Sequence, residues 1–383
     1  MVGGAGPGAV PAARLAKHDR ARLAYHAAMS AASQPEMTDH PEGIDVASVT
    51  RWLSEQGCGY EAPLRFEVLP GGHSNFTFRV QDNSGRTFVL RRPPLGELLP
   101  SAHDMAREFR IISALWPTPV PVPEPIAFCD DVAVTGARFF CMGAVDGKSL
   151  YEAADVVAQV PEELRRQLSF SFIDVLAELH ALDPDEIGVG DLGRKDAYVA
   201  RQLKRWFASW NASQTADTAS LTDVATLHDE LSARLPEQGP ARLVHGDYGL
   251  HNCLSARGGF IAAVVDWEIS TLGDGLADLA YALNTWVGPE DPPPVKPDVP
   301  TLEPGFARRA ELTARYAERT GADLSQLPYY SAFNHWKTTC ILQGVYARYL
   351  QGQKSSEGVD LVMLARRRDQ ALMLSRLALE AAN

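Results

Sequence analysis

LVHGDYGLHNCL, residues 243–254, and AAVVDWEIS, residues 262–270, each combine a short apolar run with oxygen-bearing side chains. The apolar runs are typical of buried strands. Asp247 comes first, Asn252 follows it five positions later, and Asp266 ends the second apolar run fourteen positions beyond that. Three such side chains at the ends of buried strands indicate a site rather than a packed core.

The whole chain limits which kinds of site are plausible. It has 383 residues, enough for one large or two moderate domains with a real core. A formal net charge of −12 argues against general affinity for nucleic acid or for an anionic membrane. No apolar run approaches the roughly 18–20 residues that span a bilayer. The five cysteines are scattered without a C-x-x-C pair, which fits a reducing, cytoplasmic location and no zinc site.

The N-terminal part of the chain is rich in strands. Residues 64–94 have a period of two and predict three short strands, broken by PGGHSN and by the turn sequence DNSGR. Helical periodicity predicts helices over 45–57 and 101–116. Residues 137–150 indicate a further strand, and residues 118–129 an extended connection punctuated by prolines.

After residue 150 helical periodicity dominates. Two motif strands and a Pro-rich loop interrupt it, so the predicted elements are helices at 162–183, 198–210 and 275–286, strands at 242–245 and 260–266, a loop at 288–305 and three final helices. We therefore predict an α+β fold with a small β-rich N-lobe and a larger, mainly helical C-lobe. The expected divisions are a flexible N-terminal extension at 1–40, an N-lobe at 41–143 and a C-lobe at 144–383. Met37 is an alternative translation start.

The motif spacing suits phosphoryl transfer. That reaction requires a carboxylate that orients or deprotonates the attacking hydroxyl, and hard oxygen ligands for Mg²⁺ on the phosphates of ATP. Protein kinases supply these groups as H-R-D-x-x-x-x-N followed by D-F-G. Here HGD at 245–247, Asn252 and DWE at 266–268 reproduce that spacing. The pattern predicts Asp247 as the catalytic carboxylate and Asn252 and Asp266 as Mg²⁺ ligands, although each residue alone would be typical of a turn.

These motifs, with the continuation STLGDGLADLAYALNTW, resemble the aminoglycoside phosphotransferase superfamily of small-molecule kinases. More narrowly, the chain is similar to the kinase domain that is fused to acyl-CoA dehydrogenases in animals and stands alone in bacteria. The similarity runs from about residue 45 to 380 and includes FVLRRPPLGELLPSAHDMAREFRIISAL at 88–115 and LAELHALDP at 176–184. It implies a protein-kinase-like two-lobe fold, with ATP and Mg²⁺ as cofactors and a small hydroxylated molecule as substrate.

The resemblance also assigns the nucleotide-binding residues. Arg91 is expected to contact the phosphates, with Arg92 on the opposite face of the strand. Glu108 would pair with Arg91, and backbone groups near Met142 would meet the adenine edge. The segment LPGGHSNFTF at 69–78 takes the place of the phosphate loop, with donors from Gly71, Gly72, Ser74 and Asn75.

Three further residues are expected to support the site. His245 belongs to the catalytic motif itself, and Asp278 is expected to brace the catalytic loop through hydrogen bonds. An ordinary charge at a helix N-terminus is the other interpretation of Asp278. Glu268 either assists Mg²⁺ or has a structural role at the surface.

The chain departs from the subgroup at three positions. The usual catalytic loop reads G-D-Y-R-L-D-N, whereas here Gly249 and His251 replace the Arg and the Asp. Because that loop borders the acceptor pocket, the replacements imply an altered acceptor. Gly143 follows Met142, which is expected at the hinge between the lobes, and the subgroup often has an acidic residue at this position. None of these changes removes a group that phosphoryl transfer needs.

The acceptor is the most open question. The resemblance implies hydroxyacyl-CoA thioesters for the nearest subgroup, and aminoglycosides or amino-alcohols for more distant relatives. Coenzyme A would require cations near its phosphates. One helix face and the segment just before it offer five: Arg201, Lys204, Arg205, Arg194 and Lys195. The alternative interpretation is that these residues form a solvated basic face. Residues 324–352 are mostly apolar, with Asn334, His335 and Lys337 as their main polar groups, and His335 is typical of a core histidine. This composition favours an apolar hydroxylated acceptor over an aminoglycoside.

Two other functions are weighed against this kinase. A protein kinase is disfavoured because no A-P-E-like segment follows Asp266, and the chain passes directly from DWEIS into GDGLADLA. A nucleotide-binding pseudokinase would be expected to lack Asp247, Asn252 or Asp266, and all three are present.

Overall fold

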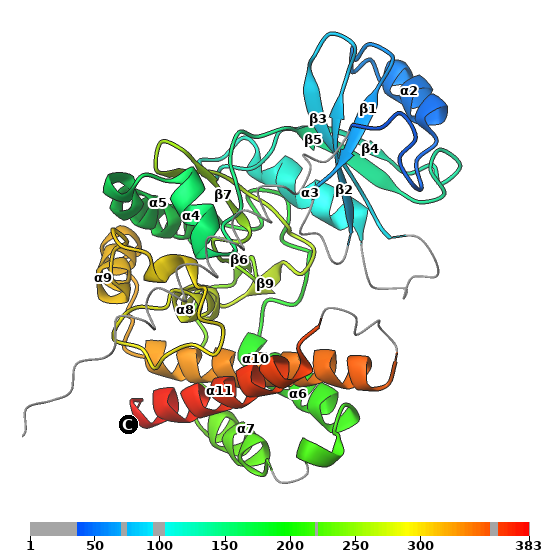
Figure 1. The fold of residues 1–383 in the computed structure, drawn as a ribbon. Helices are drawn as coiled ribbons and strands as arrows, with labels where there is room; N and C mark the ends of the chain where they lie inside the picture. The colour runs from blue at the N-terminus through cyan, green and yellow to red at the C-terminus, as the bar shows by residue number, and fades with distance from the viewer. Residues whose placement is uncertain (1–36, 70–74, 95–103, 219–220, 353–358, 383) are drawn as a thin grey trace, which may run out of the picture.

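The computed structural model describes residues 37–69, 75–94, 104–218, 221–352 and 359–382. Gly71, Gly72 and Ser74 lie outside this range, and so does nearly all of the predicted N-terminal extension. The chain forms two lobes, with the strands β1 to β5 in the upper lobe of Figure 1 and most helices in the lower one. The predicted α+β, protein-kinase-like arrangement is therefore present.

The N-lobe is built on one antiparallel sheet of five strands in the order β1-β2-β3-β5-β4. The strands are β1 (Arg65–Val68), β2 (Phe76–Gln81), β3 (Thr87–Arg92), β4 (Pro125–Cys129) and β5 (Phe139–Gly143). Strand β4 falls in the segment predicted as an extended connection. Its pairing with β5 shifts register between Pro125 and Ala127, and a proline is tolerated here because it is the first residue of an edge strand.

The two faces of this sheet pack against different helices. Phe88 and Leu90 of β3 join the cluster formed with Trp52 of α2 (Val46–Glu55). Val89 faces the other way, into the cluster that contains Ile112 of α3 (Met105–Leu115). Since side chains alternate along a strand, Arg91 and Arg92, which follow Leu90, also point to opposite faces of the sheet. Arg91 consequently lies on the α3 side of the sheet, where the lobes meet.

The C-lobe is mainly helical and also contains two small two-stranded sheets. Its helices are α4 (Ala153–Gln159), α5 (Glu162–Ala181), α6 (Tyr198–Ala212), α7 (Asp223–Ala233), α8 (Gly275–Thr285), α9 (Arg309–Thr320), α10 (Leu327–Leu350) and α11 (Leu361–Glu380). Strand β6 (Arg242–Val244) pairs with β9 (Thr271–Gly273), and β7 (Cys253–Ala256) with β8 (Phe260–Val264). The helices α4 and α7 and the strands β7 and β9 were not predicted. The two strands are only three or four residues long and carry almost no periodicity.

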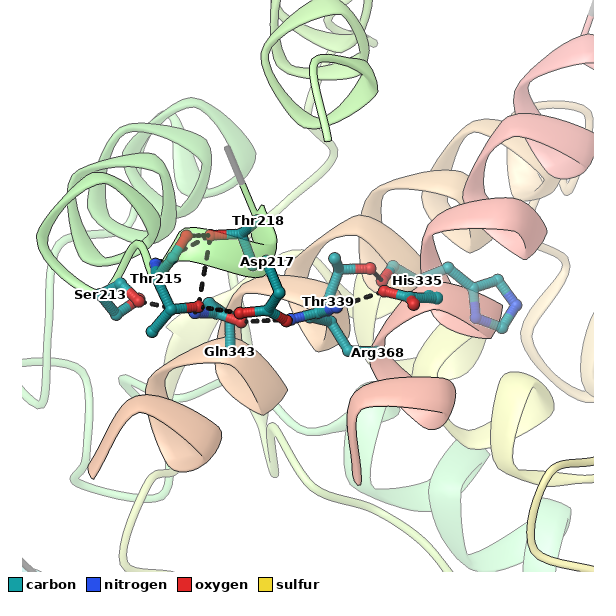
Figure 2. Close-up of polar contacts among 9 residues, drawn as sticks. Ser213, Thr215, Asp217, Thr218, His335, Thr339, Gln343 and Arg368 are labelled. Carbon is teal, nitrogen blue, oxygen red and sulfur yellow. Dashed lines mark hydrogen bonds and ion pairs between the residues drawn. The ribbon is translucent and has the colours of Figure 1, made fainter. Parts of the chain in front are cut away.

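A polar network that is buried at Arg368 and Gln343 joins the end of α6 to α10 and α11 (Figure 2). Arg368 of α11 is only 3% exposed and donates to Gln343 at 2.8 Å and to Asp217 at 3.1 Å. Gln343 in turn donates to the carbonyl of Ser213 at 2.6 Å. A buried guanidinium without partners would be costly, so this network specifies how the helices pack. The ring of His335 on α10 points away from it in Figure 2.

The helices of the C-lobe are not membrane spans. None within the described segments combines the length and the apolar character that crossing a bilayer requires.

A substitution in the β7–β8 turn can test how closely this hairpin packs on α5. Gly259 has φ +73°, and an added Cβ would lie 2.8 Å from the Cβ and from the carbonyl oxygen of Leu164. Gly85 is the matched control, because it has φ +87° and nothing within 4 Å. We expect Gly85→Ala to cost about 1–2 kcal/mol, from the left-handed backbone alone. Gly259→Ala should cost about 1–3 kcal/mol more, from overpacking. Urea denaturation measures both, and equal costs would contradict this close packing.

Candidate active site

The loop that carries the HGD motif is held in place by a buried carboxylate. Asp278 of α8 accepts the backbone N–H of His245 at 2.7 Å and of Gly246 at 2.8 Å. Its Oδ2 also lies 3.3 Å from Nε2 of His180. Burial opposes the charge on Asp278, but the hydrogen bonds from His180 and from the Gly246 N–H hold its pKa below the usual value. Asp278 therefore supports the loop through hydrogen bonds.

The buried His245 connects the two motifs. Its Nδ1 accepts the backbone N–H of Asp247 at 3.3 Å, so the proton resides on Nε2, which donates to the carbonyl of Val265 at 3.0 Å. The ring packs on Trp267, with the centroids 4.7 Å apart. The N–H of Val265 donates to the carbonyl of Asn252 at 2.9 Å. Asp247, Asn252 and Asp266 are thus brought together by contacts within and between the two motifs.

The carboxylate of Asp247 has partners on both oxygens. Oδ2 accepts from the amide of Asn252 at 3.1 Å, while Oδ1 accepts from the hydroxyl of Tyr281. Nε2 of His251 lies 3.4 Å from the same Oδ1. Burial raises the pKa of Asp247, but the hydrogen bond and charge of His251 outweigh it, with help from Tyr281, and lower the pKa to about 2. Asp247 is therefore ionised near neutral pH.

Arg91 lies at the junction of the two lobes. Its Nε donates to Glu108 of α3 at 3.0 Å, and its Nη2 contacts Asp266 at 2.5 Å. Asp266 has φ +67°, a left-handed conformation that is unusual for a residue other than glycine. Arg92, the next residue, turns to the other face and donates to the carbonyl of Thr135 at 3.0 Å. The guanidinium of Arg91 therefore joins α3 to the DWE motif.

Burial and the neighbouring charges shift the pKa values of Glu108 and Arg91 in opposite directions. Burial raises the pKa of Glu108, and the Arg91 guanidinium opposes that shift. Burial also disfavours the charge on Arg91, but Glu108 and Asp266 together keep its pKa above the usual value. The cation is thus retained in a buried position by the two carboxylates beside it.

Other contacts between the lobes lie next to the pair of Arg91 and Glu108. Asn75, which is 2% exposed, donates to Glu268 at 2.9 Å. Glu268 therefore contacts the start of β2 and has a partner other than a metal. Arg107 of α3 donates to the carbonyl of Leu192 at 2.8 Å and to that of Ser270 at 2.7 Å. These contacts hold the helix that carries Glu108 against the C-lobe.

Met142 lies at the end of the sheet where the chain leaves the N-lobe. It pairs with Val89 and Pro125 in the sheet, and its side chain is buried. The N–H of Gly143 donates to the carbonyl of Glu124 at 2.8 Å, and a Cβ at this position would lie 3.2 Å from the Cβ of Glu124. A side chain at position 143 would therefore require Glu124 to shift by a few tenths of an ångström.

A cavity of about 720 Å³ opens beside Asp247, within the range of ordinary ligand sites. His251 and Tyr281, which both contact Asp247, form one end of it. Much of the remaining wall is apolar or aromatic and includes Leu150, Leu250, Leu283, Trp286, Leu342 and Leu374. His335 also lines the cavity, rather than lying within the core as expected, and burial lowers its pKa to about 4.

The Pro-rich loop forms another wall of this cavity and is held by three helices. Arg309 of α9 binds both oxygens of Asp291, at 2.8 and 2.6 Å. Gln370 of α11 accepts the N–H of Val295 at 2.9 Å. Asp298 accepts the N–H of Ala153, at the start of α4, at 2.7 Å. The two carboxylates of this loop that line the cavity, Asp291 and Asp298, therefore both have partners within the protein.

The basic face of α6 lies elsewhere. Arg194 and Lys195 form exposed ion pairs with Asp196 and Asp185. Arg205 lies over the ring of Trp206. None of the five basic residues considered for a coenzyme A site lines the cavity beside Asp247. The solvated-face interpretation suits these contacts better.

Comparison with known proteins identifies the family. The profile of the phosphotransferase enzyme family matches residues 65–312, well over half of the chain. The chain belongs to this family. It is 35% identical over 331 residues to acyl-CoA dehydrogenase family member 11 of Gallus gallus, covering 82% of this chain and 41% of that protein. The human protein of the same name is 33% identical over 316 residues, with 81% and 40% covered. The chain spans about two-fifths of the length of these relatives.

Solved structures agree with the family assignment. A Ralstonia eutropha protein proposed to be an aminoglycoside phosphotransferase has a TM-score of 0.75 and 29% identity, over 88% of this chain and 99% of that one. Aminoglycoside phosphotransferase APH(4)-Ia in complex with ADP and hygromycin B has a TM-score of 0.55 and 19% identity, over 85% and 98%. Plasmodium vivax ethanolamine kinase has a TM-score of 0.54 and 16% identity, over 80% and 82%. The last two share the fold alone.

Several residues of this phosphotransferase site carry no motif signal in the sequence. Tyr281 lies in an ordinary helical pattern, and only the packing of α8 beside the catalytic loop brings its hydroxyl to Asp247. Arg107 is one of several arginines in its segment. The Pro-rich loop is recognisable as a loop, but not as a cavity wall.

The brace at Asp278 can be tested by a conservative substitution. Asp278→Asn would place an amide N–H₂ group against a backbone N–H and leave a buried donor unpaired. We expect a loss of about 2–4 kcal/mol in the free energy of unfolding, measured by urea denaturation. Asp196→Asn is the control, since this side chain is 68% exposed in its pair with Arg194. The control should cost less than about 1 kcal/mol, and similar losses for both variants would contradict the bracing role.

Proposed function

We propose that this chain transfers the terminal phosphoryl group of ATP to a hydroxyl of a small molecule. The observation that carries the proposal is the convergence of Arg91, Asp266, Asn252 and Asp247 at the junction of the lobes. Nucleotides occupy related folds, since APH(4)-Ia was solved with ADP and with AMP-PNP, and aminoglycoside 2′-phosphotransferase-IIIa with GDP.

The donor set fits Mg²⁺. The amide nitrogen of Asn252 is engaged by Asp247, so its amide oxygen is the atom that can ligate a metal. Asp266 adds a carboxylate, and both are hard oxygen ligands of the kind that Mg²⁺ prefers. Bound Mg²⁺ would neutralise charge on the β- and γ-phosphates. Arg91 would contact the phosphates, and Gly71, Gly72, Ser74 and Asn75 would cover them, while backbone groups near Met142 would meet the adenine.

Asp247 would orient the acceptor. With its pKa near 2, the carboxylate is a weak base that accepts a hydrogen bond from the hydroxyl without removing the proton in advance. The hydroxyl oxygen attacks the γ-phosphorus as the bond to the bridging oxygen of ADP breaks. The proton then leaves by way of Asp247 to solvent. Such a mechanism depends on positioning, which the contacts of Tyr281 and Asn252 with Asp247 support.

The cavity beside Asp247 favours an apolar hydroxylated acceptor, of which a hydroxyacyl-CoA-like thioester is one. Its wall is mostly apolar, and both acidic residues of the Pro-rich wall are engaged, Asp291 by Arg309 and Asp298 by the N–H of Ala153. A polycationic acceptor would require unengaged carboxylates there. The names of the curated relatives, acyl-CoA dehydrogenase family members, point to the same class. An aminoglycoside or amino-alcohol acceptor is the alternative, favoured by the more distant structural neighbours.

Replacing the catalytic carboxylate tests the reaction itself. We expect Asp247→Ala to lower kcat by about a thousandfold or more, because orientation and general-base assistance are both lost. Binding of ATP, measured by calorimetry, should stay within a few-fold of wild type. Asp130→Ala is the control, since Asp130 is 69% exposed in a pair with Arg138. Wild-type turnover by Asp247→Ala would remove Asp247 from this role.

An ATP-consumption screen tests the acceptor. Hydroxyacyl-CoAs, aminoglycosides and amino-alcohols are compared, with the Asp247→Ala protein as the blank for each. We expect consumption above the blank with a hydroxyacyl-CoA, because the cavity wall is mostly apolar. Consumption with aminoglycosides alone would instead establish the antibiotic phosphotransferase alternative. No consumption with any acceptor, despite ATP binding, would favour a pseudokinase.

A further inference from the structure

Gly249 and His251 are linked by a steric constraint within the catalytic loop. A Cβ added to Gly249 would lie 2.5 Å from Cε1 and 2.7 Å from Nδ1 of the His251 ring. Carbon atoms that are not bonded to each other pack at about 3.5–4.0 Å, so no other side chain fits at position 249 while the ring stays in place. Gly249 has no positive φ, and its role is therefore to leave space for the imidazole.

The position of the ring has a direct consequence for Asp247. Nε2 of His251 lies 3.4 Å from Oδ1, the oxygen that also accepts the hydroxyl of Tyr281, while Asn252 holds Oδ2. Three side chains therefore surround one carboxylate. Two of them, His251 and Tyr281, also line the cavity, whereas Asn252 lies on the side proposed for the metal.

The ring also forms part of the cavity wall nearest to Asp247. Its centroid lies 6.2 Å from that of Tyr151, which lines the same cavity. The segment that carries Tyr151 is tied to the catalytic loop, because the N–H of Leu150 donates to the carbonyl of Leu250 at 3.0 Å. His251, Tyr151 and Tyr281 therefore all line the cavity in which an acceptor would bind.

We propose that His251 is a positioning and specificity-determining residue, placed by the missing side chain of Gly249, that orients Asp247 towards an acceptor in the adjoining cavity. The inference rests on the proposed phosphoryl transfer and extends it to the acceptor side. The side chain of His251 is 30% exposed. Its loss should accordingly change turnover far more than stability.

A double-mutant cycle on Gly249 and His251 tests the proposal. His251→Ala should lower kcat by about tenfold to a hundredfold with a hydroxybutyryl-CoA acceptor, because a small misplacement of Asp247 is costly. The KM for ATP should stay within a few-fold. Gly249→Ala displaces the ring and should cause a similar loss, and the double variant should be no worse than His251→Ala alone. His251→Gln, which keeps a side-chain donor, should retain more activity than His251→Ala.

Two controls keep the outcomes distinct. Gly239→Ala is the matched glycine change, because nothing lies within 4 Å of its added Cβ, and it should leave turnover unchanged. Modification of His251 by diethylpyrocarbonate, followed by mass spectrometry, reports the ring position without turnover and should be faster in Gly249→Ala than in wild type.

The possible failures differ from one another. Independent, multiplying losses in the double variant, or wild-type kcat in His251→Ala, would overturn this inference while the phosphotransferase function stands. A wild-type protein that transfers phosphate to none of the screened acceptors would overturn the proposed function and this inference together.

Discussion

The buried guanidinium of Arg91 is the interaction on which the arrangement of the two lobes depends. It is held between Glu108 of α3 and Asp266 of the DWE motif, at 3.0 and 2.5 Å. Breaking a buried pair by removing one partner costs about 3–5 kcal/mol, since it leaves an uncompensated charge. The guanidinium therefore ties the sheet and α3 to the DWE motif of the C-lobe. Contacts of Asn75 and Arg107 with the C-lobe reinforce this connection.

A second constraint acts on the loop of the HGD motif, in addition to the packing of its buried residues Tyr248 and Leu250 in the core. The backbone of the HGD motif is fixed by Asp278, and its side chains are fixed by Val265 and Asn252. Hydrogen bonds to a buried carboxylate are directional, so they set the loop geometry more narrowly than packing could. The left-handed backbone of Asp266 is tolerated because the surrounding contacts determine it.

Much of the fold follows from periodicity in the chain. The helices with a marked apolar face, such as α2, α3 and α6, have clear helical patterns, and β2 and β3 alternate around a recognisable turn. Strand β4 begins at a proline, and β7 and β9 are only three or four residues long, so a local pattern could not identify them. Their formation depends on pairing with distant segments. The sorting of Arg91 and Arg92 to opposite faces, in contrast, follows from alternation along a single strand.

The sequence determined the grouping of the HGD and DWE motifs, and the tertiary structure determined the cavity beside them. Asp247, Asn252 and Asp266 lie within twenty residues of one another in the loops that flank the β7–β8 hairpin, so their spacing alone brings them close. Tyr281, the Pro-rich loop and the helices that hold it come from segments far apart in the chain. No local spacing encodes which of them meet, because that depends on how α8, α9 and α11 pack. The physical reason is that short-range geometry is set by backbone dimensions, whereas a cavity wall is set by the packing of the whole lobe.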